Sequence, residues 1–165
     1  MIQIELKNYK DVATRINKLR ISLGKTDVPM KAIGLRIHKW ILDNFAAEGA
    51  LGGKKWAPLA TSTVMARRGG KLKKAYKGGK ITKGEYVSSA GIKILQDTGL
   101  MRASYNWRAR ADEVRIGSPE KKAKWHQEGG KHMPARPMLP PESIATQIAM
   151  DEIERWAKGV VAGAH

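Results

Sequence analysis

Two long amphipathic patterns near the ends of the chain constrain its fold most strongly. In each pattern apolar residues recur at helical spacing, which gathers them on one face of a helix that must be buried. The first pattern consists of Ile33, Ile37, Trp40, Ile41 and Phe45, with Pro29 suited to the first turn of the helix. The second follows Glu142 and consists of Ile144, Ile148, Ile153, Trp156 and Val160. We predict one helix that ends near Ala47 and another that runs from Glu142 into a frayed tail over residues 162–165.

Alternating apolar and polar residues predict strands between and before these helices. Tyr105, Trp107 and Ala109 alternate with polar residues, and Val114 and Ile116 do so again a few residues later. This arrangement is typical of an antiparallel hairpin. Residues 2–6 alternate in the same way and predict a short strand, after which residues 9–23 have helical spacing up to a glycine.

Three shorter helices and one extended segment complete the prediction. The helices are expected over residues 61–67, over residues 99–104 with Asp97 or Thr98 as the cap, and after Pro119 up to Gly129. Residues 133–140 are interrupted by prolines, which confines them to an edge strand or a rim. The predicted class is α+β, a small antiparallel sheet packed by two or three amphipathic helices, in a single domain over residues 1–165.

A glycine-rich basic stretch interrupts this pattern over about residues 67–93. Its basic residues are Arg67, Arg68, Lys71, Lys73, Lys74, Lys77, Lys80 and Lys83. Irregular segments of this length are usually functional or disordered, so we interpret the stretch as a long basic loop or hairpin arm. The whole chain has 31 Lys and Arg against 15 Asp and Glu, a net charge of +16, which favours nucleic acid or an acidic protein surface as partner.

The sequence offers little for catalysis. It has no cysteine, which excludes thiolate chemistry and disulfides, and no apolar run that approaches the roughly 18 residues of a membrane span. The best enzymatic hypothesis is a metal nuclease with His126, Glu128 and His132, helped by Asp97 or Asp112. Such sites need more clustered acids, so we expect no enzyme, no metal and no cofactor. Because no apolar run is long enough to span a bilayer, we also expect no membrane partner.

Five short motifs occur in a fixed order between residues 56 and 139. They are Trp56-Ala57-Pro58-Leu59, residues 94–100 (ILQDTGL), residues 114–118 (VRIGS), residues 125–130 (WHQEGG) and residues 134–139 (PARPML). In this order they resemble the phage virion morphogenesis family, the tail-completion and neck proteins of tailed bacteriophages and Mu-like prophages. The residues in these motifs are of the kinds that cap helices, form turns and occupy edges. They are therefore expected to build the fold.

The resemblance implies a structural subunit of the virion, made in the cytoplasm of the bacterial host. Such a subunit forms a homo-oligomeric ring, with a hexamer favoured over a dodecamer, at the head–tail junction or the tail top. Its partners would be other neck or tail proteins and, transiently and without sequence specificity, the genomic DNA. The basic arm would face DNA or a neighbouring ring, and Arg136 is the candidate for a subunit interface. The alternative is a stand-alone nucleic-acid-binding module that stacks bases on Trp107, Tyr76 and Tyr86.

Overall fold

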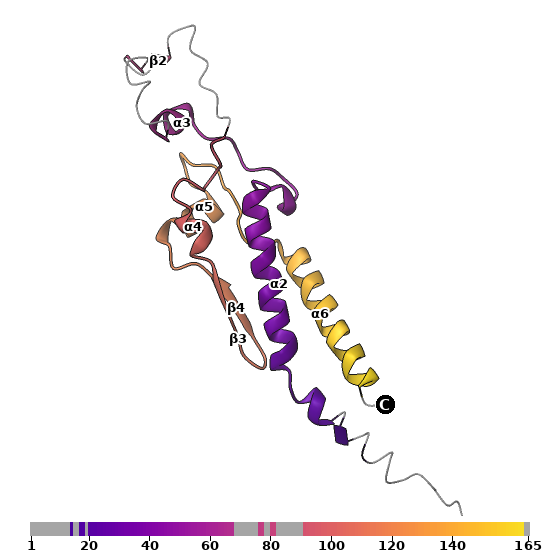
Figure 1. The fold of residues 1–165 in the computed structure, drawn as a ribbon. Coiled ribbons are helices and arrows are strands. Elements are labelled where there is room, and N and C mark those ends of the chain that lie inside the picture. Colours follow the sequence, from indigo (N-terminus) through magenta and orange to yellow (C-terminus); the bar gives the residue numbers. More distant parts are fainter. Residues whose placement is uncertain are drawn as a thin grey trace, which may run out of the picture. The chain divides into compact units, whose positions relative to one another are not determined.

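The computed structural model of the chain describes Thr14 and residues 17–18, 20–67, 76–77, 80–81 and 91–163 (Figure 1). Its named helices are α2 (Asp27–Ala46), the 3-10 helix η1 (Ala50–Gly52), α3 (Thr61–Arg67), α4 (Leu100–Ala103), α5 (Lys121–Glu128) and α6 (Glu142–Ala162). The strands form two separate two-stranded sheets, β1 (Tyr76–Lys77) with β2 (Lys80–Ile81), and β3 (Asn106–Ala109) with β4 (Val114–Gly117). These elements confirm the α+β class.

The chain divides into two compact units, each built from segments that are distant in sequence. Unit 1 comprises Met1–His38, Trp107–Ile116 and Pro141–His165, and unit 2 comprises Lys39–Asn106 and Gly117–Pro140. Helix α2 therefore contributes to both units. No boundary between the units falls within the basic stretch, and the single domain stays a prediction.

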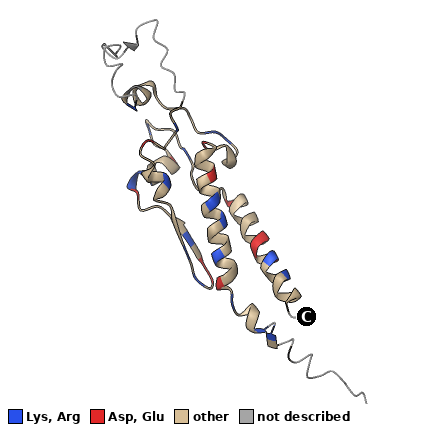
Figure 2. Cartoon of the chain, viewed as in Figure 1, with Lys and Arg blue, Asp and Glu red and all other residues tan. Residues whose placement is uncertain are grey.

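In unit 1, the first part of α2 lies beside α6 (Figure 1). Ile33, Ile37 and Ile148 are buried there, as their helical spacing predicts. The two helices are joined by Arg36, whose Nη1 donates to Glu152 Oε1 at 2.8 Å and whose Nη2 donates to Asp151 Oδ2 at 3.2 Å. These ion pairs fix the alignment of the two helices, and Figure 2 marks charged positions on both.

Another surface of α2 in unit 1 packs against the β3–β4 hairpin through Gly34 and Trp107. A methyl group added at Gly34 would lie only 2.3 Å from Cε3 of Trp107. The glycine therefore lets the indole ring approach the helix backbone. This contact fixes the hairpin on α2, so α2 is covered by the hairpin at one position and by α6 at another.

In unit 2, the second part of α2 supplies the centre of the core. Ile41, Asn44 and Phe45 are fully buried, and so is Met138 from the proline-interrupted segment. Trp56, Val64, Ile94, Leu95 and Tyr105 are also buried around them. The core of unit 2 thus collects residues from six separate stretches of sequence, four of which lie outside helices and strands.

Several predicted elements are confirmed. Helix α3 has the predicted bounds, α2 ends one residue before Ala47, α5 ends at Glu128 with Gly129 as its cap, and the hairpin of β3 and β4 occurs where the alternation placed it. The described residues between 14 and 23 are helical, in agreement with the predicted helix there, and α6 extends to Ala162. The strand predicted over residues 2–6 and the last two residues of the frayed tail lie outside the described part of the chain.

Other predictions need correction. Gly99, with φ of 75°, occupies the cap position of α4, Thr98 Oγ1 accepts from Leu100 N at 3.4 Å, and Asp97 instead pairs with Arg67. Ile153 is 39% exposed, because the neighbouring Glu152 takes the buried position and pairs with Arg36.

The segment over residues 133–140 contains no named strand and has only one isolated bridge, between Gly130 and Met133. Its prolines and its inward-facing side chains prevent a regular ladder. Among the described helices, none is both long and apolar enough to cross a bilayer.

The Gly34–Trp107 contact can be tested by adding one methyl group. Gly34→Ala is expected to lower the free energy of unfolding by about 1–3 kcal/mol, because overpacking outweighs the gain in helix propensity. In Gly159→Ala on α6, by contrast, the new Cβ meets nothing within 4 Å, so the stability should rise by up to about 1 kcal/mol. Urea denaturation of both variants measures the difference, and equal effects would contradict the contact.

Candidate functional site

The first and last motifs cross each other in unit 2. The indole Nε1 of Trp56 donates to the Pro137 carbonyl at 2.9 Å. In the opposite direction, Arg136 donates from Nε to the Ala57 carbonyl and from Nη2 to the Pro58 carbonyl, both at 3.0 Å. Because Trp56 and Arg136 are 5% and 6% exposed, these bonds form largely out of water and tie together two segments about 80 residues apart.

An aromatic cluster lies under this crossing. Phe45 makes edge-to-face contacts with Trp56 at 5.4 Å and with Tyr105 at 5.9 Å between ring centroids. The Tyr105 hydroxyl donates to Met138 Sδ at 3.4 Å. Burial raises the pKa of Tyr105 to about 12, so its hydroxyl stays protonated and keeps donating at neutral pH.

Amide side chains of two further motifs attach backbone that has no regular partner. Gln127 Oε1 accepts from Met138 N at 2.8 Å and from Leu139 N at 3.2 Å. Gln96 Nε2 donates to the Phe45 carbonyl at 2.8 Å, next to the end of α2. These glutamine side chains provide hydrogen-bond partners for backbone groups that would otherwise be paired in a strand ladder.

The turn after α5 depends on Gly129. Its φ is 76°, and a Cβ there would lie 2.7 Å from the backbone nitrogen of Ala135. The His126 carbonyl next to it accepts from Arg136 N at 2.6 Å. Together these contacts place the PARPML motif against α5, with Arg136 directed into the unit.

The last residue of the remaining motif, Ser118, bonds within unit 2 to the residue after α4. The hydroxyls of Ser104 and Ser118 lie 2.6 Å apart, and Ser118 Oγ also accepts from Glu120 N at 3.1 Å. Four of the five motifs therefore bond to each other or to the core, and the VRIGS motif bonds to residues beside α4 and α5. This arrangement supports their interpretation as groups that build the fold.

Arg136 already has partners within the chain. Its hydrogen bonds go to carbonyl oxygens, and no described carboxylate pairs with it. Burial lowers the pKa of Arg136, and the positive charge of Arg67 lowers it further. Arg136 as a whole is 6% exposed, so most of it is covered by its own chain, and its predicted contact with a neighbouring subunit remains a prediction.

Of the predicted basic arm, only Arg67 has a described side chain. Its Nη1 donates to the Lys93 carbonyl at 2.8 Å, and its Nε lies 3.6 Å from Asp97 Oδ1. Arg67, the first residue of the arm, thus bonds to the last residue of the arm and pairs with an acidic residue just after it. Lys77 and Lys80 pair with each other in the β1–β2 ladder, while Arg68, Lys71, Lys73, Lys74 and Lys83 lie outside the described residues.

The residues of the nuclease hypothesis do not gather into a metal site in the described part of the chain. Glu128 and His132 are exposed, and Asp97 pairs with Arg67. His126 Nδ1 is buried without a partner among the described residues. Burial lowers the pKa of His126, and Arg136 and Lys122 lower it further, which favours the neutral imidazole.

The alternative of a nucleic-acid-binding module also assigned a role to Trp107. Its indole is half-buried and packs against Gly34, so at least part of its ring serves the contact with α2. The side chain of Tyr76 and the whole of Tyr86 belong to the part of the chain that the structure does not describe.

Two buried polar residues escaped the sequence reasoning. Asn44 is fully buried and its Nδ2 donates to the Pro137 carbonyl at 3.3 Å, while its Oδ1 has no partner among the described residues. Asn44 lies three residues after Ile41 and next to Phe45, on the apolar face of α2. This spacing could have predicted its burial. Glu152 lies four residues after Ile148 in the same way.

Most of the motifs thus form a connected set of contacts that holds the irregular segments of unit 2 together. The chain belongs to the phage virion morphogenesis family, whose model matches residues 6–157, nearly the whole sequence. Membership gives the chain a structural or assembly role in the virion. No curated protein and no solved structure matches the chain.

The crossing of the motifs can be tested with a matched pair of tryptophans. Trp56→Phe keeps an aromatic ring beside Phe45 but removes the hydrogen bond to Pro137, so it is expected to cost about 1–3 kcal/mol of stability. Trp125→Phe changes a side chain that is 59% exposed and should stay within about 0.5 kcal/mol of the wild type. Chemical denaturation gives both values, and a Trp125 effect as large as that of Trp56 would contradict the assignment.

Proposed function

We propose that this chain is the subunit of a homo-oligomeric ring, a hexamer or else a dodecamer, at the head–tail junction or the tail top. The ring completes the tail and joins it to the head around the DNA channel. Family membership supports a role in virion assembly. The net charge of +16 suits a channel that DNA must pass without base-specific contacts.

The observation that carries the ring beyond family membership is the set of large apolar side chains that unit 1 leaves exposed on its two long helices, called here its apolar surface. Leu35 on α2 and Met150 on α6 are each 61% exposed, Val161 is 56% exposed and Val28 is 50% exposed. Large apolar side chains left exposed in this number are candidates for protein–protein contacts. A second copy of the chain is the partner that a ring provides at every interface.

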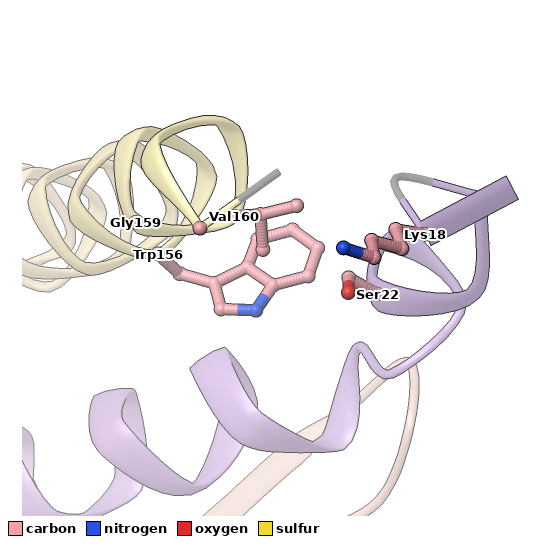
Figure 3. A pocket seen from close by; sticks show the side chains of 6 residues that line it. Lys18, Ser22, Trp156, Gly159 and Val160 are labelled. Atoms are coloured by element: carbon pink, nitrogen blue, oxygen red, sulfur yellow. The ribbon is translucent and has the colours of Figure 1, made fainter. Parts of the chain in front are cut away.

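A hollow near the end of α6 adds to this surface. Its volume is about 390 Å³, and Trp156, Gly159 and Val160 form one side of it, with Lys18 and Ser22 opposite (Figure 3). The indole of Trp156 is half-buried, so part of a large aromatic ring remains open to a partner. Buried at an interface, it would add apolar area to that of Met150 and Val161.

The charge of the chain opposes this association. Copies that each carry +16 repel one another, so a ring needs salt, DNA or an acidic neighbour to screen the repulsion. We therefore expect the fraction of assembled protein to increase with ionic strength. We also expect the ring to form on contact with the tail tube.

The ring interface can be tested by placing charges on the apolar surface. The double variant Leu35→Glu and Met150→Glu is expected to lower the assembled fraction by about tenfold or more, because it puts carboxylates into each apolar contact. The control pair Leu35→Met and Met150→Leu keeps the surface apolar and should assemble normally. Light scattering and negative-stain imaging at high salt report the oligomer, and unchanged rings in the charged variant would contradict this interface.

The basic arm is the proposed contact with DNA or with an acidic neighbouring ring. Changing Lys71, Lys73, Lys74 and Lys77 to Gln should lower the yield of infectious, DNA-filled particles by about tenfold or more, because four cationic contacts are lost. The matched control changes four exposed lysines outside the arm, Lys121, Lys122, Lys124 and Lys131, to Gln. Complementation of a phage that lacks the gene measures the yield, and normal particles with the arm variant would reject the proposed role.

A further inference from the structure

We infer that a groove in unit 2 binds an acidic peptide segment that inserts an apolar side chain. The groove has a volume of about 460 Å³ and lies between the stretch around Trp56 and the Pro134–Pro137 stretch. That the peptide belongs to a neighbouring virion protein rests on the proposed function. The chemistry of the groove does not depend on it.

The walls of the groove are apolar and rigid. Trp56 and Ala57 line one side, and Pro134, Ala135 and Pro137 line the other. Prolines have few backbone conformations to lose, and the crossing hydrogen bonds of Trp56 hold the two sides together. A groove that is formed before binding loses little entropy when a ligand enters, which favours even a short segment.

The backbone of these walls is already engaged. The Pro137 carbonyl accepts from Trp56 Nε1 and from Asn44 Nδ2, and the Ala57 carbonyl accepts from Arg136 Nε. Recognition must therefore come from side chains at the rim and from apolar contact within the groove.

The charged residues at the rim are both cations. Lys54 and Lys55 line the groove and are exposed, and neither forms an ion pair with a described residue. No described acidic residue lines the groove. A ligand that matches both features must carry carboxylates beside an apolar group, which describes an acidic peptide segment.

The phosphates of a nucleic acid have the charge to pair with the lysines, but a nucleic acid does not fit the apolar walls of the groove. A base would need an open aromatic face on which to stack, whereas Trp56 is 5% exposed and its indole nitrogen is bonded to Pro137. Phosphates would lose hydration against prolines and alanine without gaining a hydrogen-bond donor there. The observations therefore favour peptide over DNA.

Gly52 offers a way to close the groove without disturbing the fold. It lines the groove, its φ is not in the left-handed region, and an added Cβ meets nothing within 4 Å. Gly52→Phe should fill the groove and leave Lys54 and Lys55 unchanged. The double variant Lys54→Glu and Lys55→Glu tests the rim, and Lys121→Glu with Lys122→Glu makes the same change of charge at exposed positions of α5.

The experiment measures fluorescence anisotropy of the full-length protein at physiological ionic strength with three labelled probes of equal length. They are an acetylated peptide that repeats Asp-Glu-Leu-Asp-Glu-Phe, polyglutamate, and a DNA duplex. Gly52→Phe and the Lys54/Lys55 variant should each weaken binding of the first peptide by about tenfold or more, and the Lys121/Lys122 variant by no more than about twofold. Circular dichroism verifies that each variant is folded.

Three results would overturn the inference. They are undetectable binding of the first peptide, wild-type binding by Gly52→Phe, and equal binding of polyglutamate or DNA with equal sensitivity to both lysine pairs. The last result would show general attraction of polyanions to a basic surface. The groove variants leave Leu35 and Met150 intact, so they should assemble as the wild type does. Failure of the ring would thus appear in the oligomeric state and failure of the groove in peptide binding.

Discussion

The buried guanidinium of Arg136 is the group on which the rest of unit 2 depends. A cation this deep in a protein is costly unless its donors find oxygen acceptors, and here the Ala57 and Pro58 carbonyls provide them. Those carbonyls lie at the required positions because Trp56 is bonded to the Pro137 carbonyl next to Arg136. Neither segment has a regular ladder to hold it, so each depends on the other.

Unit 1 is held together by different contacts. Its helices meet through buried isoleucines, a close glycine–tryptophan contact and an ion pair between Arg36 and Glu152. Glu152 is also bonded to Arg155 Nη1 at 2.8 Å, so this buried carboxylate has two cationic partners. Its neighbours on α6 include Met150 and Ile153, which point to solvent. A firm inner contact with an apolar outer surface is what a subunit of a larger assembly needs.

Periodic patterns in the sequence predicted the regular elements well. The apolar stripe of α2, the alternation of the β3–β4 hairpin and the bounds of α3 all follow from local rules that need no knowledge of partners. The glycine after α5 was also predictable from the sequence, since Gly129 caps the helix with a positive φ of 76°, which glycine adopts most readily.

The long-range contacts could not be predicted in this way. Asp97 was assigned to a helix cap and instead pairs with Arg67, because sequence spacing does not reveal that residues 67 and 97 lie close in space. The stiff, extended segment around Arg136 predicted a rim, but spacing could not reveal that Arg136 also bonds to the Ala57 and Pro58 carbonyls, and its contact with a neighbouring subunit stays a prediction. Likewise Glu152, four residues after Ile148, lies on the buried face of α6 and pairs with Arg36, whereas Ile153, five residues after Ile148, lies off that face.

These observations divide the described chain into parts that build the fold and parts that remain available for assembly. The five family motifs belong mainly to the first group, and the apolar surface of unit 1 and the rim lysines to the second. Arg67, the first residue of the basic arm, is bonded to the Lys93 carbonyl at the other end of the arm.

The most direct test of a ring subunit is an electron-microscopic reconstruction of the mature virion of the phage that encodes this chain. We predict density for the protein as a closed ring around the DNA channel at the head–tail junction or the tail top. Density elsewhere in the virion, or no copies of the chain in the mature particle, would contradict this proposal.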